Sequence, residues 1–378
     1  MIDQQNKCEV CHSDMQLFAQ DFKSAVTSDC KFVNSDIPYL YCRQCGCICI
    51  DPRQRIDYTK FYASDYKLYL QSDEVEPVFQ GQGASQCSVD FLSELIPDDH
   101  EKTFFDIGAG KGNILEAFHQ RFPSLSYYAL EPSAAYKKLI QKDFLTETYS
   151  DFYNAQNFHE RSFDFISIVC VLEHVSSPKM FLDDIKKVMH DDSILLVEVP
   201  NFEVNKYDLL TIDHFSKFTS AALINLFNVC GLEVLKQDKS KGLYMRFAVK
   251  KNMSKRNEQA LETNIESYLN QSNKTIVHAI SDIQSVNSQK VAMYGQSSIL
   301  TYIIGTKEIS SHQISCIIDD NTLYQGLKFQ GNINIVSFDV FNSTYEAKTI
   351  FLSMNDCYHQ FVLPKLEGYN VIGKSIQH

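Results

Sequence analysis

Three glycines alternate along segment 106–112, which reads Asp-Ile-Gly-Ala-Gly-Lys-Gly. Glycine is needed where a backbone turns sharply or must approach a ligand without an intervening Cβ atom. The segment follows an apolar run at 103–107 and precedes apolar residues at helical spacing over 113–122. A helix that begins there would direct its free N–H groups at a ligand. The pattern therefore predicts a ligand-binding loop between a strand and a helix.

A carboxylate that could bind a ribose, that of Glu131, follows this loop in the sequence. The predicted strand 126–130 ends directly before Glu131, about 20 residues after the glycines. A carboxylate at the end of the second strand can accept hydrogen bonds from both hydroxyls of a ribose, as in dinucleotide-binding folds. Glu131 is therefore a candidate ligand for a nucleoside.

Two Cys-x-x-Cys pairs stand near the N-terminus, with 30 residues between them. Each pair can direct two thiolates at one metal ion, and two pairs complete a tetrahedral zinc site. The predicted ligands are Cys8, Cys11, Cys42 and Cys45. Four thiolates leave no open position, so the zinc is expected to be structural. Alternative ligands of lower rank are Cys47, Cys49, His12 and Cys30, and the alternative to a metal site is a set of unrelated buried thiols.

Strands and helices alternate through the rest of the chain, which predicts parallel sheets with helices on both faces. Residues 58–70 are aromatic and predict a linker or short helical cover, and 79–85 predict a flexible loop. The expected central strands are 103–107, 126–130, 163–171 and 193–199, with helices at 113–122 and 179–189. One or two connecting helices are expected within 251–288. A second α/β pattern is expected at 290–294, 297–304, 314–318 and 349–353.

These patterns divide the chain into four regions. A zinc-binding head and linker occupy 1–70, and an α/β core that carries the glycine loop occupies 71–250. Connecting helices occupy 251–285, and a smaller α/β domain occupies 286–378. A chain of 378 residues is long enough for several cores of ordinary domain size.

The glycine loop and three later segments together resemble the class I methyltransferases, which have a Rossmann-like fold and bind S-adenosylmethionine (SAM). The loop has the spacing D-x-G-x-G-x-G, and Glu131, 163–175 and 194–201 match later motifs in order. The resemblance implies that the SAM-binding residues are Asp106, Gly108, Ala109, Gly110, Gly112, Glu131, Asp151, Phe152, Glu173 and His174. For His174 it favours a pocket-lining or structural role.

The order of head, core and tail resembles the zinc-containing C-methyltransferases that act on nucleotide-linked deoxysugars. Segments 291–295, 317–321 and 325–328 are similar to that family's C-terminal domain. The resemblance implies that Asp213 and His214 are catalytic. Methylating a carbon beside a ketone requires a base that forms an enolate, and a histidine oriented by a carboxylate suits that role.

Two positions depart from that family's pattern. Thr211 stands where a tyrosine is expected, for which Tyr207, Tyr62 or Tyr66 could substitute, and the loop 295–299 lacks a lysine-bearing, Gly/Ala-rich run. Two alternatives therefore remain. One is an O- or N-methyltransferase on a sugar or other small molecule, and the other is a catalytically inactive SAM-binding module.

Composition limits the classes of substrate that the protein could bind. The net charge of −12 argues against a nucleic-acid substrate, because phosphate binding requires a basic surface. The polar N-terminus does not resemble a signal peptide, and no apolar run is long enough to span a membrane, so a cytoplasmic enzyme with a small-molecule substrate is expected. The acceptor, the methylated atom and the oligomeric state are left open.

Overall fold

The computed structural model describes residues 7–66, 82–97, 102–158, 160–240, 242–252, 261 and 264–374. Its central element is a mixed sheet that has seven strands among these residues. In spatial order they are β12 (Leu232–Gln237), β13 (Tyr244–Lys251), β10 (Met189–Pro200), β9 (Phe163–Val169), β6 (Thr103–Ile107), β7 (Ser126–Leu130) and β8 (Leu145–Tyr149).

The five strands from β8 to β10 are parallel, whereas β13 runs antiparallel to both β10 and β12. The alternation of strands and helices had predicted a parallel sheet. The prediction holds for these five strands and is wrong for β13. The chain leaves β6 toward β7 on one side and later returns to β9 on the other. Ligands of doubly wound sheets bind at the carboxyl ends of the strands where the order reverses. The glycine loop lies at this point.

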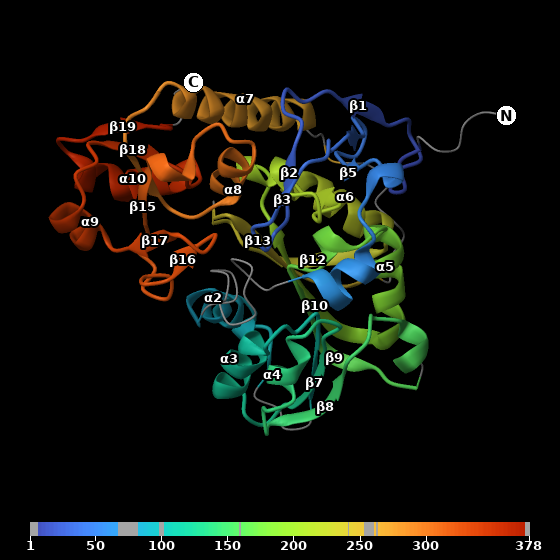
Figure 1. Ribbon diagram of the computed structural model, residues 1–378. Coiled ribbons are helices and arrows are strands. Elements are labelled where there is room, and N and C mark those ends of the chain that lie inside the picture. The colour runs from blue at the N-terminus through green and yellow to red at the C-terminus, as the bar shows by residue number, and fades with distance from the viewer. Residues whose placement is uncertain are drawn as a thin grey trace.

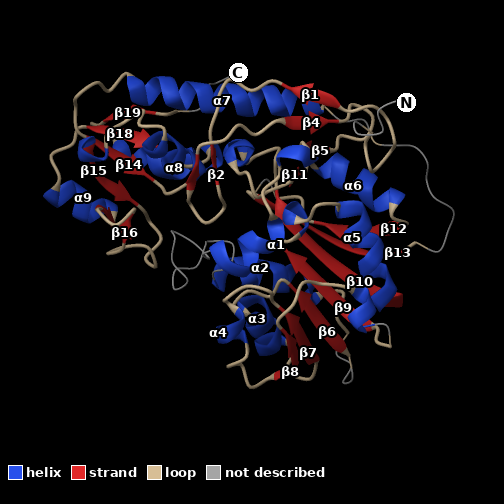
Figure 2. Ribbon diagram, turned by 45° about the vertical axis from the view of Figure 1, so that its right-hand side comes forward, coloured by secondary structure: helices blue, strands red, loops and turns tan. Residues whose placement is uncertain are grey.

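Helices cover both faces of the central sheet (Figure 2). Apolar residues of α2 (Gln82–Ser93), α3 (Asn113–Arg121) and α4 (Tyr136–Leu139) share one core with residues of β6 and β7, among them Phe104 and Tyr127. Residues of α5 (Pro178–Ile185) and α6 (Ser220–Val229) share the opposite core with Phe105 and Ile107. Alternate residues of β6 thus face opposite layers, as the period of a strand requires.

Two local predictions differ from the structure. Residues 79–81 of the predicted flexible loop lie outside the described residues, but 82–85 begin α2. Val89 and Leu92 of that helix are fully buried, so tertiary packing overrides the low helix propensity of the glycine there. The predicted helix 179–189 ends at Ile185, and a 3₁₀ turn leads into β10 at Met189. The last residues of the linker, 67–70, lie outside the described residues.

The C-terminal region forms a second, six-stranded α/β sheet within the described residues. Its spatial order is β16 (Lys328–Phe329), β17 (Ile333–Val336), β15 (Ile314–Ile318), β14 (Val291–Tyr294), β18 (Thr349–Leu352) and β19 (Asn370–Ile372). Its helices are α8 (Ser298–Gly305), α9 (Phe338–Thr344) and α10 (His359–Val362). Strand β14 lies between β15 and β18, so the strand order reverses here as well.

The N-terminal region consists of short strands, a 3₁₀ turn at Pro52–Gln54 and an aromatic helical segment. A four-stranded sheet contains β1 (Gln16–Phe18), β4 (Tyr39–Tyr41), β5 (Ile48–Ile50) and β11 (Ser216–Lys217), and β2 (Ala25–Val26) pairs with β3 (Phe32–Val33). The aromatic segment forms α1 (Tyr58–Lys60) and a π-helix at Phe61–Asp65. Because β11 comes from the core region, the head sheet is completed by residues far along the chain.

A single long helix, α7 (Ile265–Gln284), spans the top of the molecule from the head to the C-terminal sheet (Figures 1 and 2). At one end Glu266 contacts Arg43, and at the other Asp282 accepts a hydrogen bond from the backbone of Gly373. One apolar cluster contains residues of the head, 202–215, α7 and the C-terminal sheet. The boundaries of the four regions stay a prediction, but the cores of these regions are continuous in this part of the molecule.

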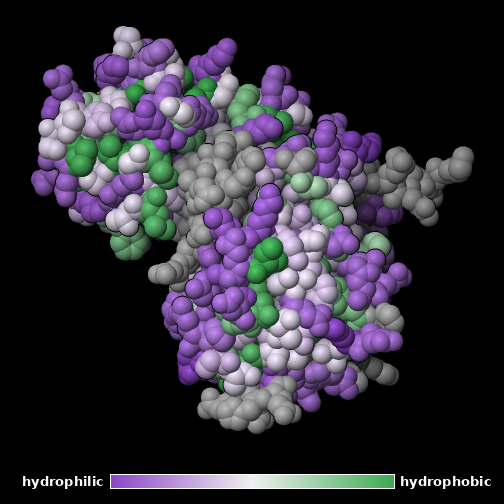
Figure 3. Space-filling model, turned by 60° about the horizontal axis from the view of Figure 1, so that its bottom comes forward, coloured by the Kyte–Doolittle hydropathy of each residue, from purple (hydrophilic) through white to green (hydrophobic). Residues whose placement is uncertain are grey.

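The face in Figure 3 is largely hydrophilic, with small groups of apolar residues between the polar ones. Among the described residues, no helix is both long and apolar enough to cross a membrane.

Candidate functional site

The glycine loop adopts a backbone that requires glycine. Gly108, Gly110 and Gly112 have φ angles of 79°, 55° and 80°. The backbone N–H groups of Gly108 and Ala109 donate to the carbonyl oxygen of Leu130 over 2.8 and 2.9 Å. A Cβ atom on residue 108 would lie 2.5 Å from a methyl carbon of Val171. The loop is therefore held against the end of β7 with no space for a side chain at its first glycine.

Glu131 links this loop to the next one. Its Oε2 accepts a hydrogen bond of 2.7 Å from the N–H of Gly110, and its Oε1 accepts one of 2.7 Å from the N–H of Ser133. Each carboxylate oxygen retains a second lone pair for a ligand hydroxyl. The geometry fits a ribose, because the carboxylate is fixed on the protein side and lines a cavity.

That cavity has a volume of about 110 Å³ and lies over the carboxyl ends of β6 and β9. Its lining includes Gly108, Gly110, Glu131, Phe152, Glu173, His174 and three tyrosines of the aromatic segment, Tyr58, Tyr62 and Tyr66.

Four of the predicted SAM ligands are absent from this lining: Asp106, Ala109, Gly112 and Asp151. Asp106 lies at the end of β6, where its carboxylate accepts a hydrogen bond of 2.6 Å from Ser167. Burial raises the pKa of Asp106 to about 7. Asp151 is exposed and its carboxylate accepts a hydrogen bond from the N–H of Phe152. Phe152 itself lines the cavity and packs on Tyr58, with ring centroids 5.4 Å apart.

Glu173 and His174 lie on a short 3₁₀ turn after β9. Nδ1 of His174 is 2.8 Å from the backbone oxygen of Asp213 and 2.7 Å from the hydroxyl of Tyr62. Burial lowers the pKa of His174 to about 4 and raises that of Glu173 to about 8. Tyr62 is thus one of the expected tyrosines that reaches the candidate site.

The carboxylate that contacts the ring of His214 belongs to Asp208, whereas the sequence had predicted Asp213. Nδ1 of His214 lies 2.5 Å from Oδ1 of Asp208, and the rings of His214 and His174 are 4.7 Å apart. Asp213 instead accepts hydrogen bonds from the N–H and hydroxyl of Ser28 over 2.8 and 2.5 Å. Asp213 lies in a turn and is held by Ser28, so it is not the hydrogen-bond partner of His214.

Asp208 is itself paired with a buried lysine. Nζ of Lys217 is 3.4 Å from Oδ2 of Asp208 and donates to the backbone oxygen of Thr211 over 2.9 Å. Burial favours the neutral acid, but Lys217 and His214 outweigh burial and lower the pKa of Asp208 to about 2. Burial opposes the imidazolium, and Asp208 outweighs that effect and raises the pKa of His214. No sequence motif marks Asp208 or Lys217, so neither residue was predicted for the site.

A second cavity of about 520 Å³ lies between the core and the C-terminal sheet. Ser28, His214 and Tyr244 line both this cavity and the smaller one. The C-terminal region contributes Tyr294, Gly295, Gln296, Ser297, Asp319 and Asp320 to the lining, among others. Tyr207 also lines this larger cavity. His214 therefore borders two spaces, one at the glycine loop and one at the second sheet.

The loop after β14 repeats the contacts of the glycine loop after β6. The N–H of Gly295 donates to the oxygen of Ile318 over 2.8 Å, as that of Gly108 does to Leu130. The residue after Ile318 is Asp319, which has the position that Glu131 has after Leu130. Its Oδ2 lies 3.4 Å from the N–H of Gln296.

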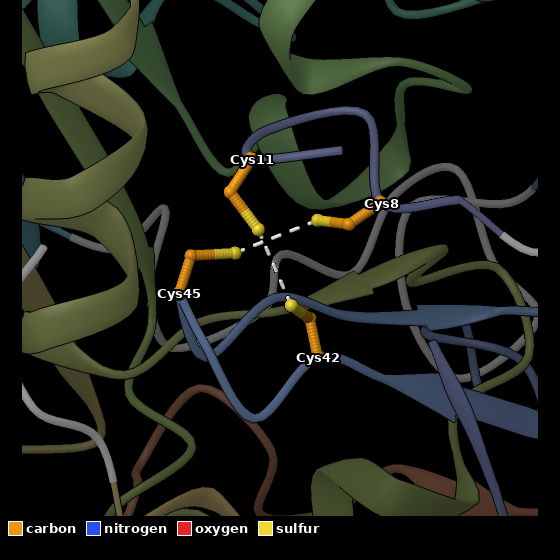
Figure 4. Close-up of side chains that lie close together, drawn as sticks. All are labelled: Cys8, Cys11, Cys42 and Cys45. Atoms are coloured by element: carbon orange, nitrogen blue, oxygen red, sulfur yellow. Dashed lines mark hydrogen bonds between the residues drawn. The ribbon is translucent and has the colours of Figure 1, made fainter. Parts of the chain in front are cut away.

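The four cysteines of the two pairs converge on one point (Figure 4). The sulfurs of Cys8 and Cys45 are 3.5 Å apart, and those of Cys11 and Cys42 are 3.4 Å apart. All four sulfurs lie within 4.8 Å of one another. Tetrahedral zinc with Zn–S bonds of about 2.3 Å would require sulfurs about 3.8 Å apart, so the arrangement fits zinc after a small expansion.

The two Cys-x-x-Cys turns have the same geometry. The residues that follow the second cysteines, His12 and Gly46, have φ angles of 61° and 77°. Their N–H groups donate to the carbonyl oxygens of Cys8 and Cys42, each over 2.9 Å. The lower-ranked candidates Cys30, Cys47 and Cys49 lie outside the group of four.

Comparisons with known proteins agree with this description of the core. The methyltransferase domain family has a model that matches residues 79–237. A mitochondrial ubiquinone biosynthesis O-methyltransferase from Dictyostelium discoideum is 28% identical over 148 residues, which are 38% of this chain and 43% of that protein. The chain thus spans less than half the length of this relative.

Solved structures overlap with part of the chain. The mitomycin 7-O-methyltransferase has a TM-score of 0.41 and 17% identity, over 52% of this chain and 61% of its own. An O-methyltransferase family protein from Burkholderia thailandensis has a TM-score of 0.38 and 17% identity, over 46% of this chain and 59% of its own.

Proposed function

Since residues 79–237 form a class I SAM-dependent methyltransferase domain, we propose that this chain methylates a carbon of a nucleotide-activated keto-deoxysugar. The observation that carries the proposal is the position of His214, which borders both the cavity at the glycine loop and the larger cavity at the C-terminal sheet. A base at such a boundary can act on an acceptor on one side while the methyl donor approaches from the other.

The residues of the smaller cavity suit SAM. Gly108 and Gly110 allow close approach of the backbone, Glu131 offers carboxylate lone pairs to ribose hydroxyls, and Phe152 offers an aromatic face to adenine. When bound, SAM supplies an electrophilic methyl group attached to a sulfonium.

The repeated loop geometry supports a nucleotide-linked acceptor. Asp319 holds the position at which Glu131 would meet a ribose, and it lines the larger cavity. No lysine or arginine of the described residues lines that cavity. Acceptor phosphates would therefore be met by the N-terminus of α8, which begins after Ser297 and directs free N–H groups at the loop.

His214 is the proposed base. Its Nδ1 donates to Asp208, so the neutral ring carries its lone pair on Nε2. In the proton-removal step, the C–H bond beside the ketone breaks and the proton moves to Nε2. The electron pair of that C–H bond forms the enolate of the acceptor. Asp208 stabilises the imidazolium that results, and the phenol of Tyr62, which is held at His174, lies on the same cavity wall.

Solvent exchange tests this step. In D₂O, the protein should exchange the proton at the α-carbon of a keto-deoxysugar nucleotide, and His214→Ala should slow exchange by about 100-fold or more. His278→Ala is the matched control. His278 also faces a carboxylate, but it lies on α7 and lines neither of the two cavities. Absence of exchange and of methyl transfer with every such sugar nucleotide would refute the proposal.

The second candidate is O- or N-methylation of a sugar or other small molecule. The D. discoideum relative is an O-methyltransferase, and its match lies in the shared core. This reaction needs no enolate, so the acceptor would show no α-carbon exchange. The NMR spectrum of the product separates the two candidates, because a methyl group on carbon is distinguished from one on oxygen or nitrogen.

We also propose that Cys8, Cys11, Cys42 and Cys45 bind a structural zinc ion. Three of these cysteines are fully or almost fully buried and belong to the apolar core that covers the central sheet. Elemental analysis should find tightly bound zinc, and Cys42→Ser should lose it together with thermal stability. Cys316→Ser, which changes a buried cysteine of the C-terminal sheet, should retain the zinc.

A further inference from the structure

We propose that Glu173, His174 and His214 bind one divalent transition-metal ion at the boundary of the two cavities. Their potential ligand atoms all lie within 4.8 Å of one another. Two imidazoles and one carboxylate form a set that holds iron, zinc or related ions and leaves positions open. This site is separate from the four cysteines and has a different ligand chemistry.

In both imidazoles Nδ1 already faces an acceptor, which leaves Nε2 for a metal ion. Nδ1 of His174 is 2.8 Å from a backbone carbonyl oxygen, that of Asp213, which can only accept. Nδ1 of His214 faces the carboxylate of Asp208 at 2.5 Å. In each neutral ring the N–H is therefore on Nδ1, and Nε2 has a free lone pair. Metal-binding histidines commonly donate their other N–H to a carbonyl or carboxylate in this way.

Glu173 provides an independent reason for a bound cation. Its side chain is 1% exposed, and among the described residues neither carboxylate oxygen has a hydrogen-bond partner. The nearest ring nitrogen, Nε2 of His174, is 3.9 Å from Oε1. A buried carboxyl group without partners is costly. An ion held between Glu173 and the two Nε2 atoms would satisfy the carboxylate and both lone pairs.

The charges around the site favour a divalent cation. Asp208 and Asp213 are buried beside the two histidines, and Lys217 is the buried cation that opposes them. Once Glu173 gives up its proton to bind the ion, three carboxylates face one ammonium. The attraction of these carboxylates for an ion of charge +2 adds to the ligand bonds.

Metal binding has a consequence for turnover, and this consequence rests on the proposed function. A metal ion on Nε2 of His214 removes the lone pair that would accept the acceptor proton. The ion is therefore an inhibitor of the proposed methyl transfer, and a chelator should restore activity. Metal binding itself requires no acceptor, so its test is independent of the identity of the substrate.

Cobalt(II) titration of protein that holds one equivalent of zinc, at the cysteines, tests the site. We expect a visible d–d absorption that saturates near one equivalent, without the thiolate charge-transfer band that a cysteine site would give. Glu173→Gln should weaken cobalt binding by at least about 10-fold. His278→Gln, which alters a histidine–carboxylate pair on α7, should bind cobalt as the unmodified protein does.

A second variant guards against a folding defect in the first. His214→Asn removes one ligand atom, and it should also weaken cobalt binding at least about 10-fold. The proposal is overturned if the unmodified protein gives no d–d absorption, or if both folded variants bind cobalt with unchanged affinity. It is equally overturned if the absorption carries the thiolate band, because the ion would then lie at the cysteines.

Discussion

The core and the C-terminal region each contain a strand, a glycine loop and a helix at the point where the strand order reverses. In the core, the N–H of Gly108 donates to the last residue of β7, and in the C-terminal sheet Gly295 does the same to the last residue of β15. A Cβ on Gly108 would meet Val171 after β9 at 2.5 Å, and one on Gly295 would meet Met354 after β18 at 2.9 Å. The backbone arrangement is shared by both loops.

The side chains that follow differ between the two loops. The core loop continues with Gly110 and Gly112, and Glu131 is fixed by two backbone N–H groups. The C-terminal loop continues with Gln296 and Ser297 and has no further glycine before α8. The core cavity is small and the C-terminal one is several times larger. The same backbone arrangement can therefore bind two different ligands, and the residues after the first glycine determine which ligand each loop fits.

Alanine at the first glycine of each loop should have the largest effect and should separate the ligands. In Gly108→Ala, the contact with Val171 and the left-handed backbone should weaken SAM binding by about 100-fold. In Gly295→Ala, calorimetry should find SAM affinity unchanged and only the acceptor KM raised. If Gly295→Ala lost SAM affinity to the same extent, the two loops would not have separate ligands.

The two units meet at His214, so its carboxylate partner should matter next. Asp208→Asn should lower kcat by about 10- to 100-fold with little change in SAM affinity, because the imidazolium loses its paired charge. Asp213→Asn, which alters the carboxylate that is hydrogen-bonded to Ser28, should lower kcat less. Equal losses in both variants would contradict the assignment of Asp208 as the positioning residue.

The two acidic residues after β7 and β15 allow a matched test at smaller scale. Glu131→Gln should raise the Kd of SAM about 10-fold, since a charged acceptor contributes about 1.5 kcal/mol to a hydrogen bond. Asp319→Asn should raise the acceptor KM by a similar factor and leave the Kd of SAM unchanged. A change in SAM affinity in Asp319→Asn would remove the proposed equivalence.

The smallest effect concerns the residue two positions before each first glycine, which is Asp106 in the core and Met293 in the C-terminal sheet. The pKa of Asp106 rises from 3.8 to about 7 on burial. The folded state therefore retains this proton between about pH 4 and 7 when the unfolded chain has lost it, so stability falls as pH rises through that range.

Asp106→Asn removes this dependence. Its melting temperature relative to the unmodified protein should increase from pH 4 to pH 7 and then stay constant. Asp339→Asn, which changes an exposed carboxyl group on α9 of the C-terminal region, serves as the control. A difference that is independent of pH would show that Asp106 does not titrate in this range.

Much of the framework follows from local patterns in the sequence. The strands at 103–107, 126–130 and 314–318 have the predicted bounds, because parallel buried strands are short, continuous apolar runs. The glycines of the cofactor loop and the paired cysteines are likewise recognised by spacing, since a tight turn brings together residues only a few positions apart.

The tertiary structure alone decided which distant groups meet. Asp208, Lys217 and His214 form one buried network. Ser28 donates hydrogen bonds to Asp213, and β11 pairs with a strand of the head sheet. Residues 82–85 became helical because α2 packs on the central sheet. Local patterns report the turn, strand or helix that a segment prefers. The partner of a buried charge depends on packing between segments far apart in the chain, and no spacing rule encodes that packing.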